Sequence, residues 1–482
     1  MKPLICTPFH ASSGTRTLRQ RVLVAASAVL LLQAGCTVPA DPAPSDPIVL
    51  PECFTASGTL QLQPQWWHGF GDDALNRLID EALASNLSLQ ATWERLEQAR
   101  ATAAKSGAAR YPDLTFEGSA STNRQFGDTT GSSQSFSMGL AASYELDFWG
   151  RVNASAEAAA LDLKASKEEL RTAALSLSGE VATAWFNLQS QHRQAALLQN
   201  QITLNEKHLE LTERKFRSGQ AKASDVLQQR QSLEASKGEA IQVHKNISLY
   251  EHRLALLLGR VPGSLSPEPI PALPEPIIPK TGVPSELLMQ RPDVKAAYFA
   301  LQAADKRLAA AVADRYPRFS IGASIESSAL HASDLFNTWL ATLAGSLSAP
   351  LFDGGLRRAE AQRSAAARNE QFYLYAQTLL DAVKEVEDAL SEVAHQRRYV
   401  ESLERQLELS SAAVAQLREQ YLRGSGSFVS FLNAQLSHES LQRNRVSATD
   451  LLIEKSITLY RALSTGWEPE RQATNQRSAD VR

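Results

Sequence analysis

Residues 111–151 read YPDLTFEGSASTNRQFGDTTGSSQSFSMGLAASYELDFWGR, and a related stretch begins at Tyr316. Tyr111 and Tyr316 lie 205 residues apart, and so do Gly150 and Gly355 near the ends of the two stretches. Two stretches that stay in step in this way indicate an internal duplication. We therefore expect one architecture built from two copies of the same structural unit.

Both stretches alternate between apolar and small polar residues, which is the pattern of a β-strand. The apolar face of the first strand would carry Leu114, Phe116, Gly118 and Ala120. The alternation lapses from Asn123 to Ser135, which we interpret as a polar loop, and then resumes. The sequence thus predicts β-hairpins at about 112–149 and 317–352.

The alternating segments are long enough to cross a membrane. A tilted membrane-spanning strand needs about 9 to 11 residues, with its apolar side chains in lipid and its small polar ones facing a wet lumen. A strand that packs one face on a soluble core would alternate in the same way, so both interpretations stay open on the strands alone. Four acidic residues would lie on the lumen face, either biasing conduction towards cations or serving as a solvated lining: Glu117, Glu145, Asp147 and Glu326.

The N-terminus reads as an export signal. An apolar run at 22–32 follows several arginines and is too short to span a bilayer, so we expect residues 1–35 to be removed as a signal peptide. Small residues directly before Cys36 resemble a bacterial lipoprotein cleavage site, in which this cysteine becomes the lipid-modified first residue. Gln33 stands where such sites usually carry Leu, so cleavage without lipidation is the alternative. Residues 36–65, which begin with a Pro-rich run, would form an extended tether.

The composition and the motifs exclude several classes of function. The 49 basic and 52 acidic residues give a net charge of −3, which indicates no nucleic-acid partner. Three cysteines cannot build a disulfide framework. The sequence contains no HExxH, CxxC, GxSxG or phosphate-binding glycine loop. We therefore predict no enzyme activity, no cofactor and no metal site.

Two long regions are predicted to be helical. Val152 to Arg217 contains no proline and a single glycine, and Arg357 to Arg423 contains neither. At 1.5 Å per residue, such helices would extend to about 100 Å. The second region carries an apolar seam at heptad spacing, which predicts a coiled-coil partner, although a soluble coiled-coil rod would show the same seam. The seam comprises Leu379, Val383, Val386, Leu390, Val393, Val400, Leu403, Leu407, Val414, Leu417 and Tyr421.

Matched glycines end the two long helices. Gly219 and Gly424 lie 205 residues apart, and glycine commonly ends a helix in left-handed geometry. Returning helices would then run to about Leu258 and Leu463. Each half is therefore predicted to be helix, strand, strand, long helix, turn and returning helix.

The duplication divides the mature chain into four further parts. The first repeat would span residues 66–260 and the second repeat 285–466. Between them, residues 261–284 form a Pro-rich connector, and residues 467–482 form a polar C-terminal tail. Four strands cannot close a barrel, and an open edge is not tolerated in lipid, so several chains must contribute. Two chains would give a filled eight-stranded barrel, whereas three would give twelve strands and room for water.

These motifs, in this order and duplicated, resemble the outer membrane factors, the TolC-like family, and specifically its lipoprotein branch related to NodT and OprM. The resemblance is carried by Trp66-Trp67 with Phe70 and Asp72, the two Tyr-Pro boundaries, Arg291-Pro292-Asp293-Val294, the run from Leu351 to Gly355, and the segment from Tyr421 to Gln435. It implies a mixed α/β membrane protein. Three chains would form a homotrimer, with a 12-stranded transmembrane β-barrel in outer-membrane lipid and a long α-helical barrel in the periplasm.

The resemblance also implies a function. The channel would dock onto a periplasmic adaptor (membrane fusion) protein and an inner-membrane pump, and would conduct small molecules such as drugs or toxic compounds to the exterior. A duct for type I protein secretion is the nearer alternative. A lipid-anchored coiled-coil envelope protein that does not conduct is the more distant one.

Site residues follow from the resemblance position by position. The periplasmic gate would lie at Val429 and Asn433, with Asp225 in the first-half turn. Relatives often carry Asp at the position of Asn433, so an acidic ring is not expected at that level. The turns at Gly219 and Gly424 would contact the adaptor.

Overall fold

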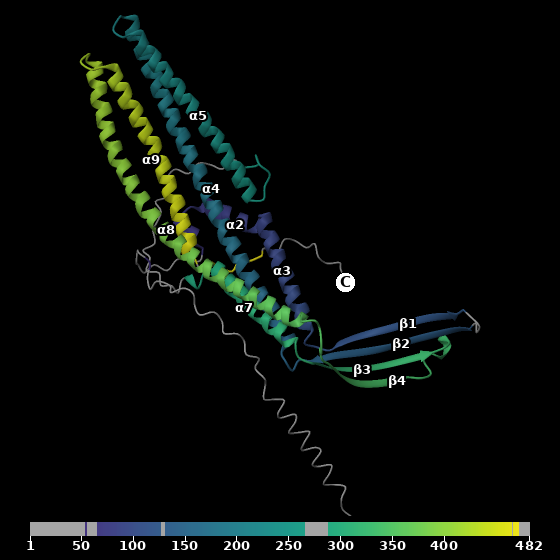
Figure 1. The fold of residues 1–482 in the computed structure, drawn as a ribbon. Helices are drawn as coiled ribbons and strands as arrows, with labels where there is room; N and C mark the ends of the chain where they lie inside the picture. The colour runs from purple at the N-terminus through teal and green to yellow at the C-terminus, as the bar shows by residue number, and fades with distance from the viewer. Residues whose placement is uncertain (1–53, 55–64, 127–130, 266–287, 465, 472–482) are drawn as a thin grey trace, which may run out of the picture. The chain divides into compact units, whose positions relative to one another are not determined.

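The structure is a computed structural model that describes residues 54, 65–126, 131–265, 288–464 and 466–471 (Figure 1). Several predicted features fall outside these residues. They are the signal peptide at 1–35, Cys36 with almost all of the tether, most of the connector at 261–284, and the tail beyond Arg471.

The same succession of elements occurs twice along the chain. The first half contains the 3-10 helix η1 (Trp66–Phe70), α2 (Asp73–Ser85), α3 (Leu87–Ala108), β1 (Asp113–Gln125), β2 (Gly131–Leu146), α4 (Arg151–Arg217) and α5 (Ala223–Leu257). The second half contains α7 (Pro292–Ala313), β3 (Arg318–Ala329), the 3-10 helix η2 (Ala332–Asp334), β4 (Leu340–Ser348), α8 (Leu356–Leu422) and α9 (Phe428–Leu463). The predicted long helices and returning helices are confirmed, and each long helix has 67 residues.

The four strands form a single antiparallel sheet in the order β1-β2-β3-β4. The two hairpins therefore join through β2 and β3, and β1 and β4 are the edges, with no partner in the described part of the chain. Gly139 lies opposite Glu326 in this register, and a Cβ atom there would come within 2.6 Å of the Ile325 carbonyl oxygen. Glycine at this position allows the central pair of strands to approach closely.

The predicted loop from Asn123 to Ser135 is wrong. β1 continues to Gln125, β2 begins at Gly131, and Asn123 pairs with Ser133. The backbone ladder needs no apolar side chain, so pairing continues after both faces of the hairpin have become polar. Loss of alternation therefore marked the end of the apolar face and not the end of the strands.

One face of the sheet is apolar and uncovered. Residues opposite each other in the ladder point to the same side, and one row across the four strands consists of Phe116, Leu140, Ile325 and Ala341. Leu343 and Leu347 continue this face on β4 and are 79% and 62% exposed. The predicted alternation is confirmed, and no described element covers the apolar side chains.

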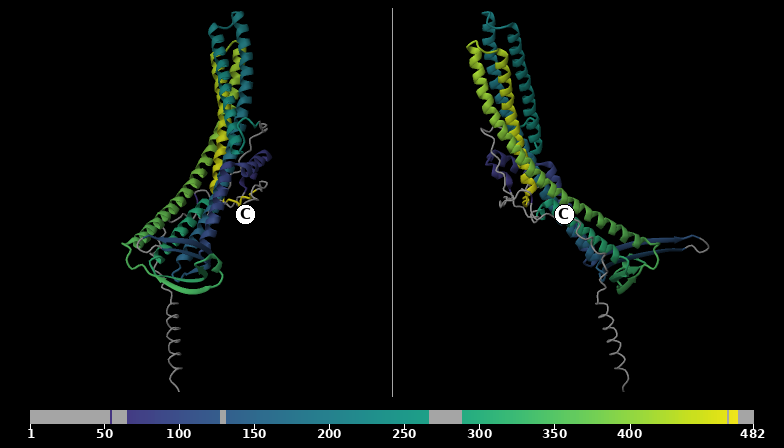
Figure 2. Two further views of the ribbon diagram at one scale, coloured as in Figure 1. Left: turned by 90° about the vertical axis from the view of Figure 1, so that its right-hand side faces the viewer. Right: turned by 60° about the vertical axis from the view of Figure 1, so that its left-hand side comes forward.

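The helices pack as two long hairpins. α4 packs against α5, and α8 packs against α9 (Figure 2). The heptad seam of α8 is buried against α9 at Leu379, Val386 and Val393, which confirms the predicted coiled-coil partner. A separate core joins η1, α2, α3, α4, α5 and α9. Its buried aromatic members are Trp66, Trp67, Phe70, Trp185, Phe186 and Tyr460.

The first residues of the predicted tail are fixed to the helices. The Trp467 ring lies 4.9 Å from the Trp67 ring, and Glu468 accepts from Lys167 Nζ at 2.5 Å. Arg471 pairs with Glu94 at 2.6 Å. The predicted polar tail therefore cannot begin before Arg471. Of the helices described, none is both long and apolar enough to cross a membrane.

Candidate functional site: the helical tips and the base of the sheet

Both helical hairpins turn through the same local structure. Gly219 has φ of 72° and Gly424 has φ of 78°, which is left-handed backbone that favours glycine. After each glycine a backbone N–H reaches back to the helix, from Gln220 to the Lys215 carbonyl and from Ser425 to the Gln420 carbonyl. Both bonds close a Schellman turn. No atom lies within 4 Å of a Cβ built on either glycine, so both turns have open space at the predicted adaptor contacts.

Asp225 has a local structural role in the first turn of α5. One carboxylate oxygen accepts from the Lys222 backbone N–H at 3.1 Å, and the other accepts from Ser224 Oγ at 3.3 Å. A carboxylate that binds the N-terminal backbone stabilises the start of a helix. The predicted gate residue of the first hairpin is therefore also the cap that shapes its tip.

Val429 and Asn433 lie one turn apart on the outer face of α9. Val429 is 42% exposed, and Asn433 is also exposed. The opposite face of the same helix buries Phe428, Phe431 and Leu432 against Val414, Leu417 and Tyr421 of α8. The structure thus places the two predicted gate residues on one stripe, directed away from the core of their own hairpin, while Asp225 lies on the other hairpin.

Aromatic contacts join the tips of the two hairpins. Lys215 Nζ of α4 lies 3.7 Å from the centroid of the Tyr421 ring on α8, within cation–π range. The His208 ring of α4 meets the edge of Phe431 at 5.2 Å, and burial, followed by the charge of Arg418, lowers the pKa of His208. The pairs Lys215–Tyr421 and His208–Phe431 were not predicted, because nothing in the spacing of the chain shows that α4 is a neighbour of α8 and α9.

Below the tips, the contact between the two hairpins is polar. Gln201 Nε2 donates to the Glu439 carbonyl at 3.3 Å, and Arg443 donates to Gln201 Oε1 at 2.8 Å. Glu439 is 2% exposed, its carboxylate accepts from Gln435 at 2.7 Å, and burial raises its pKa. At this level of the hairpins, hydrogen bonds therefore link α4 to α9.

Two of the four predicted lumen charges are engaged at the base of the sheet. Arg151 donates twice to Glu145, at 3.1 and 2.7 Å, and Asp147 accepts from the backbone N–H groups of Val152 and Asn153 at 3.1 and 2.7 Å. Asp147 also follows the last residue of β2 and caps α4. Alternation alone could not show this role, because it depends on the helix that begins after the strand.

Glu117 and Glu326 remain exposed on the face opposite the apolar one. Both lie across from Gly139 in the ladder, from the two neighbouring strands. The structure thus brings these two carboxylates to one level of the sheet, on either side of a residue without a side chain. That these two carboxylates line a lumen stays a prediction.

The junction of sheet and helices is held by Asp314 at the end of α7. Arg357 Nε lies 3.1 Å from one carboxylate oxygen of Asp314, Arg151 Nε lies 4.0 Å from the other, and Arg318 also pairs with it. Trp149 Nε1 donates to the Pro317 carbonyl at 2.8 Å, and its ring stacks on Tyr316. Residues of α4, β3 and α8 thus meet at one carboxylate at the end of α7, where the sheet begins.

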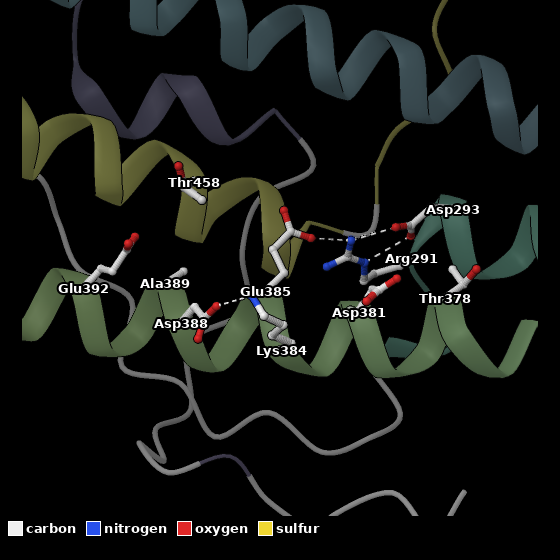
Figure 3. Close-up of a pocket in the computed structure, with 11 residues that line it drawn as sticks. Arg291, Asp293, Thr378, Asp381, Lys384, Glu385, Asp388, Ala389, Glu392 and Thr458 are labelled. Carbon is white, nitrogen blue, oxygen red and sulfur yellow. Dashed lines mark hydrogen bonds and ion pairs between the residues drawn. The ribbon is translucent and has the colours of Figure 1, made fainter. Parts of the chain in front are cut away.

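Arg291 ties α7, α8 and α9 together (Figure 3). It donates to both oxygens of Asp293, to Glu385 at 2.7 Å and to the Ala462 carbonyl at 2.9 Å. Burial raises the pKa of Asp293, but the hydrogen bonds and charge of Arg291 outweigh this and hold it below its ordinary value. The cavity beside them has a volume of about 550 Å³. Within the described residues, no three His, Cys, Asp or Glu side chains are placed to hold a metal ion.

The model of one protein family, described as outer membrane efflux protein, matches residues 78–260 and 283–465. The second match begins 205 residues after the first, which is the spacing of the duplication. The chain therefore belongs to the outer membrane efflux protein family. It is an efflux channel of the outer membrane.

Relatives and solved structures agree with this membership. The chain is 31% identical over 427 residues to the pyoverdine export outer membrane protein OpmQ of Pseudomonas aeruginosa, covering 85% of this chain and 88% of that protein. It is 28% identical to the cation efflux system protein CusC of Escherichia coli, covering 83% and 88%. A crystal structure of CusC superposes with a TM-score of 0.82 at 26% identity, over 89% of this chain and 99% of that one. SilC of Salmonella typhimurium, a probable outer membrane lipoprotein, is 26% identical over 92% of this chain and 98% of SilC.

Proposed function

We propose that three copies of the chain assemble into a single duct across the outer membrane. The edge strand β4 of one copy pairs with β1 of the next, and the twelve strands close a barrel. The helical hairpins of the three copies continue the duct into the periplasm. The duct carries small molecules from an inner-membrane pump and a periplasmic adaptor to the exterior, and it performs no catalytic step.

The observation that carries this proposal is the sheet itself. It has two unpaired edges and one uncovered apolar face. In lipid, every backbone N–H and C=O must find a partner, so such a sheet needs further strands at both edges. Two copies would leave an interior filled by side chains, whereas three provide a water-filled lumen.

The helices supply the periplasmic part of the duct. A helix of 67 residues extends to about 100 Å, far more than a bilayer requires. At its far end, the open turns at Gly219 and Gly424 contact the adaptor. The exposed stripe of Val429 and Asn433 faces the same stripe of the other two copies around the axis of the trimer and narrows the duct. Asp225 caps the neighbouring hairpin tip.

The cargo is selected outside this chain. By their names, OpmQ exports pyoverdine and CusC serves cation efflux, yet both resemble this chain over more than four-fifths of its length. One channel architecture thus accompanies chemically different cargoes, which is expected when the pump makes the choice. No feature of the described residues favours protein secretion.

An acyl chain on Cys36 anchors the N-terminus in the same membrane. The support is the small-residue pattern before Cys36 and the resemblance to SilC, which is called a probable outer membrane lipoprotein.

The number of copies is tested by native mass spectrometry of the intact protein released from detergent. We expect one species with the mass of three acylated chains. A stable monomer or dimer that still conducts in planar bilayers would contradict the twelve-stranded barrel.

A further inference from the structure

A cavity lies between α3, α4 and the C-terminal segment (residues 466–471). Its volume is about 290 Å³, which is near the lower limit of the pockets that hold small ligands. The apolar side chains that line it are those of Trp93, Leu96, Leu163, Leu170 and Pro469. The cavity thus offers an apolar surface that suits one aromatic ring or a short acyl chain.

The polar side chains of the same cavity are mostly basic. Arg100, Lys164, Lys167 and Arg171 line it, and Glu468 is the single acidic residue among the lining side chains. Glu468 accepts from Lys167 Nζ at 2.5 Å, and this hydrogen bond, followed by the charge of Lys167, holds the pKa of Glu468 below its ordinary value. The cavity therefore already stabilises one carboxylate in its ionised form.

The guanidinium of Arg171 is only partly used by its neighbours. Its Nη1 donates to Glu168 at 2.8 Å, whereas its Nη2 lies 3.7 Å from a carboxylate oxygen of Glu468, beyond hydrogen-bond distance. The Nε–H is buried and has no hydrogen-bond partner in the described part of the chain. A buried donor without a partner costs free energy. The edge formed by Nε and Nη2 thus lacks a well-placed acceptor.

Two other arginines show what this edge binds. Nε and Nη2 of Arg151 donate to the two carboxylate oxygens of Glu145 at 3.1 and 2.7 Å. Nε and Nη2 of Arg291 donate to those of Asp293 at 3.0 and 2.7 Å. Such bidentate pairs are the geometry in which arginine recognises a carboxylate. The free edge of Arg171 therefore favours a carboxylate that approaches it more closely.

Glu468 can be exchanged for such a carboxylate. Its side chain is 64% exposed, so moving it into water costs little. The segment itself is held on both sides, because the rings of Trp67 and Trp467 are in contact before Glu468 and Arg471 pairs with Glu94 after it. A ligand would thus displace one side chain and leave the segment in place.

We propose that this cavity binds a small amphipathic carboxylate. Its apolar tail lies on Trp93 and Leu96. Its carboxylate takes the place of Glu468 on Lys167 and Arg171.

The ligand is a free amphiphile and not a lipid of the bilayer. Arg171 follows the first residue of α4 by 20 residues, which corresponds to about 30 Å along the helix from the base of the sheet. A headgroup layer is only about 5–8 Å thick, so a lipid in the membrane that the sheet is proposed to cross cannot reach this arginine. This choice of source rests on the proposed duct, whereas the site itself does not.

Octanoate, a short acyl chain with one carboxylate, is the probe. Calorimetric titration into the full-length protein in phosphatidylcholine nanodiscs measures its affinity, with empty nanodiscs as the reference for partitioning into lipid. We expect saturable binding of octanoate and none of octanol, which has the same tail without the charge. Equal binding of the two compounds would overturn the inference, and so would a failure of octanoate to saturate.

Exchange of Glu468 gives the decisive comparison. We expect Glu468→Gln to bind octanoate at least about tenfold more tightly than wild type, because the internal competitor is removed. Arg171→Ala should bind it at least about tenfold more weakly, and Arg171→Lys should recover only part of this loss, since lysine has no bidentate edge.

Glu470→Gln is the matched control. Glu470 is exposed on the same segment and does not line the cavity, and its substitution changes the net charge in the same way. Equal affinities of Glu468→Gln and Glu470→Gln would overturn the inference, even if Arg171→Ala failed to fold.

Nanodiscs that contain phosphatidylglycerol test the source of the ligand, at a salt concentration that screens the charge of the lipid surface. We expect the same octanoate affinity as in phosphatidylcholine. A lower affinity would show that an anionic lipid occupies the site and would overturn the assignment to a free amphiphile. The conductance of the same wild-type sample separates these outcomes from the proposed function, since a silent channel that binds octanoate as expected would remove the duct and leave the site.

Discussion

At the scale of single residues, the guanidinium of Arg291 donates hydrogen bonds to Asp293, Glu385 and the Ala462 carbonyl, and the residue is only 9% exposed. Removing it leaves Asp293 and Glu385 without their cation and the Ala462 carbonyl without a donor. Because both carboxylates keep some contact with water, we expect Arg291→Ala to lower the free energy of unfolding by about 2–3 kcal/mol. Arg291→Lys should recover only part of this loss, since lysine cannot reproduce the fork of donors.

The measurement is thermal unfolding of the purified protein in detergent. Arg363 provides a matched control, because it pairs with Glu360 on an exposed surface of α8. Arg363→Ala should leave the midpoint unchanged, as expected for a solvated ion pair. Equal midpoints for Arg291→Ala and Arg363→Ala would show that the contacts of Arg291 contribute nothing to stability.

At the scale of the turn and the helix, we expect alanine substitutions of three glycines to change the free energy of unfolding in opposite directions. Gly219 and Gly424 have positive φ, so Gly219→Ala and Gly424→Ala should each lower the free energy of unfolding by about 1 kcal/mol. Gly238 lies inside α5 with no atom within 4 Å of a built Cβ, so Gly238→Ala should raise it by about 0.5–1 kcal/mol.

Urea unfolding of the three variants at one protein concentration checks the signs. Stabilisation by either turn substitution would contradict the left-handed geometry of the tips. The same sign at all three positions would show that only the unfolded state responds to the change.

The elements differ in how far the sequence could predict them. The 67-residue helices follow from regions almost free of helix breakers, and the heptad seam of α8 identified its buried side. The loop from Asn123 to Ser135 was misplaced because side-chain alternation reports the environment of a strand, whereas the backbone ladder continues without it. The roles of Glu145 and Asp147 were hidden for a related reason, since they depend on the start of α4.

At the scale of the whole chain, contacts between the two hairpins could not be predicted. The polar contacts between α4 and α9 join residues about 240 positions apart, such as Gln201 and Arg443, and polar residues on a helix are equally typical of a solvated surface. The burial of Phe54 in the second repeat escaped prediction in the same way. The duplication itself could be predicted because the 205-residue spacing recurs in the strand boundaries and the turns, and the two family matches have the same spacing.

The central claim is that the chain forms a gated duct whose narrowest part lies at the exposed stripe of α9. Single-channel recording in planar bilayers tests it most directly, with wild type beside the variant Val429→Ala/Asn433→Ala. We expect small steps for wild type and larger steps for the variant, because the substitutions remove side-chain volume and an amide from the constriction. If wild type and variant remain assembled and conduct equally, the position of the gate is contradicted, and if both remain assembled yet conduct nothing, the duct itself is contradicted.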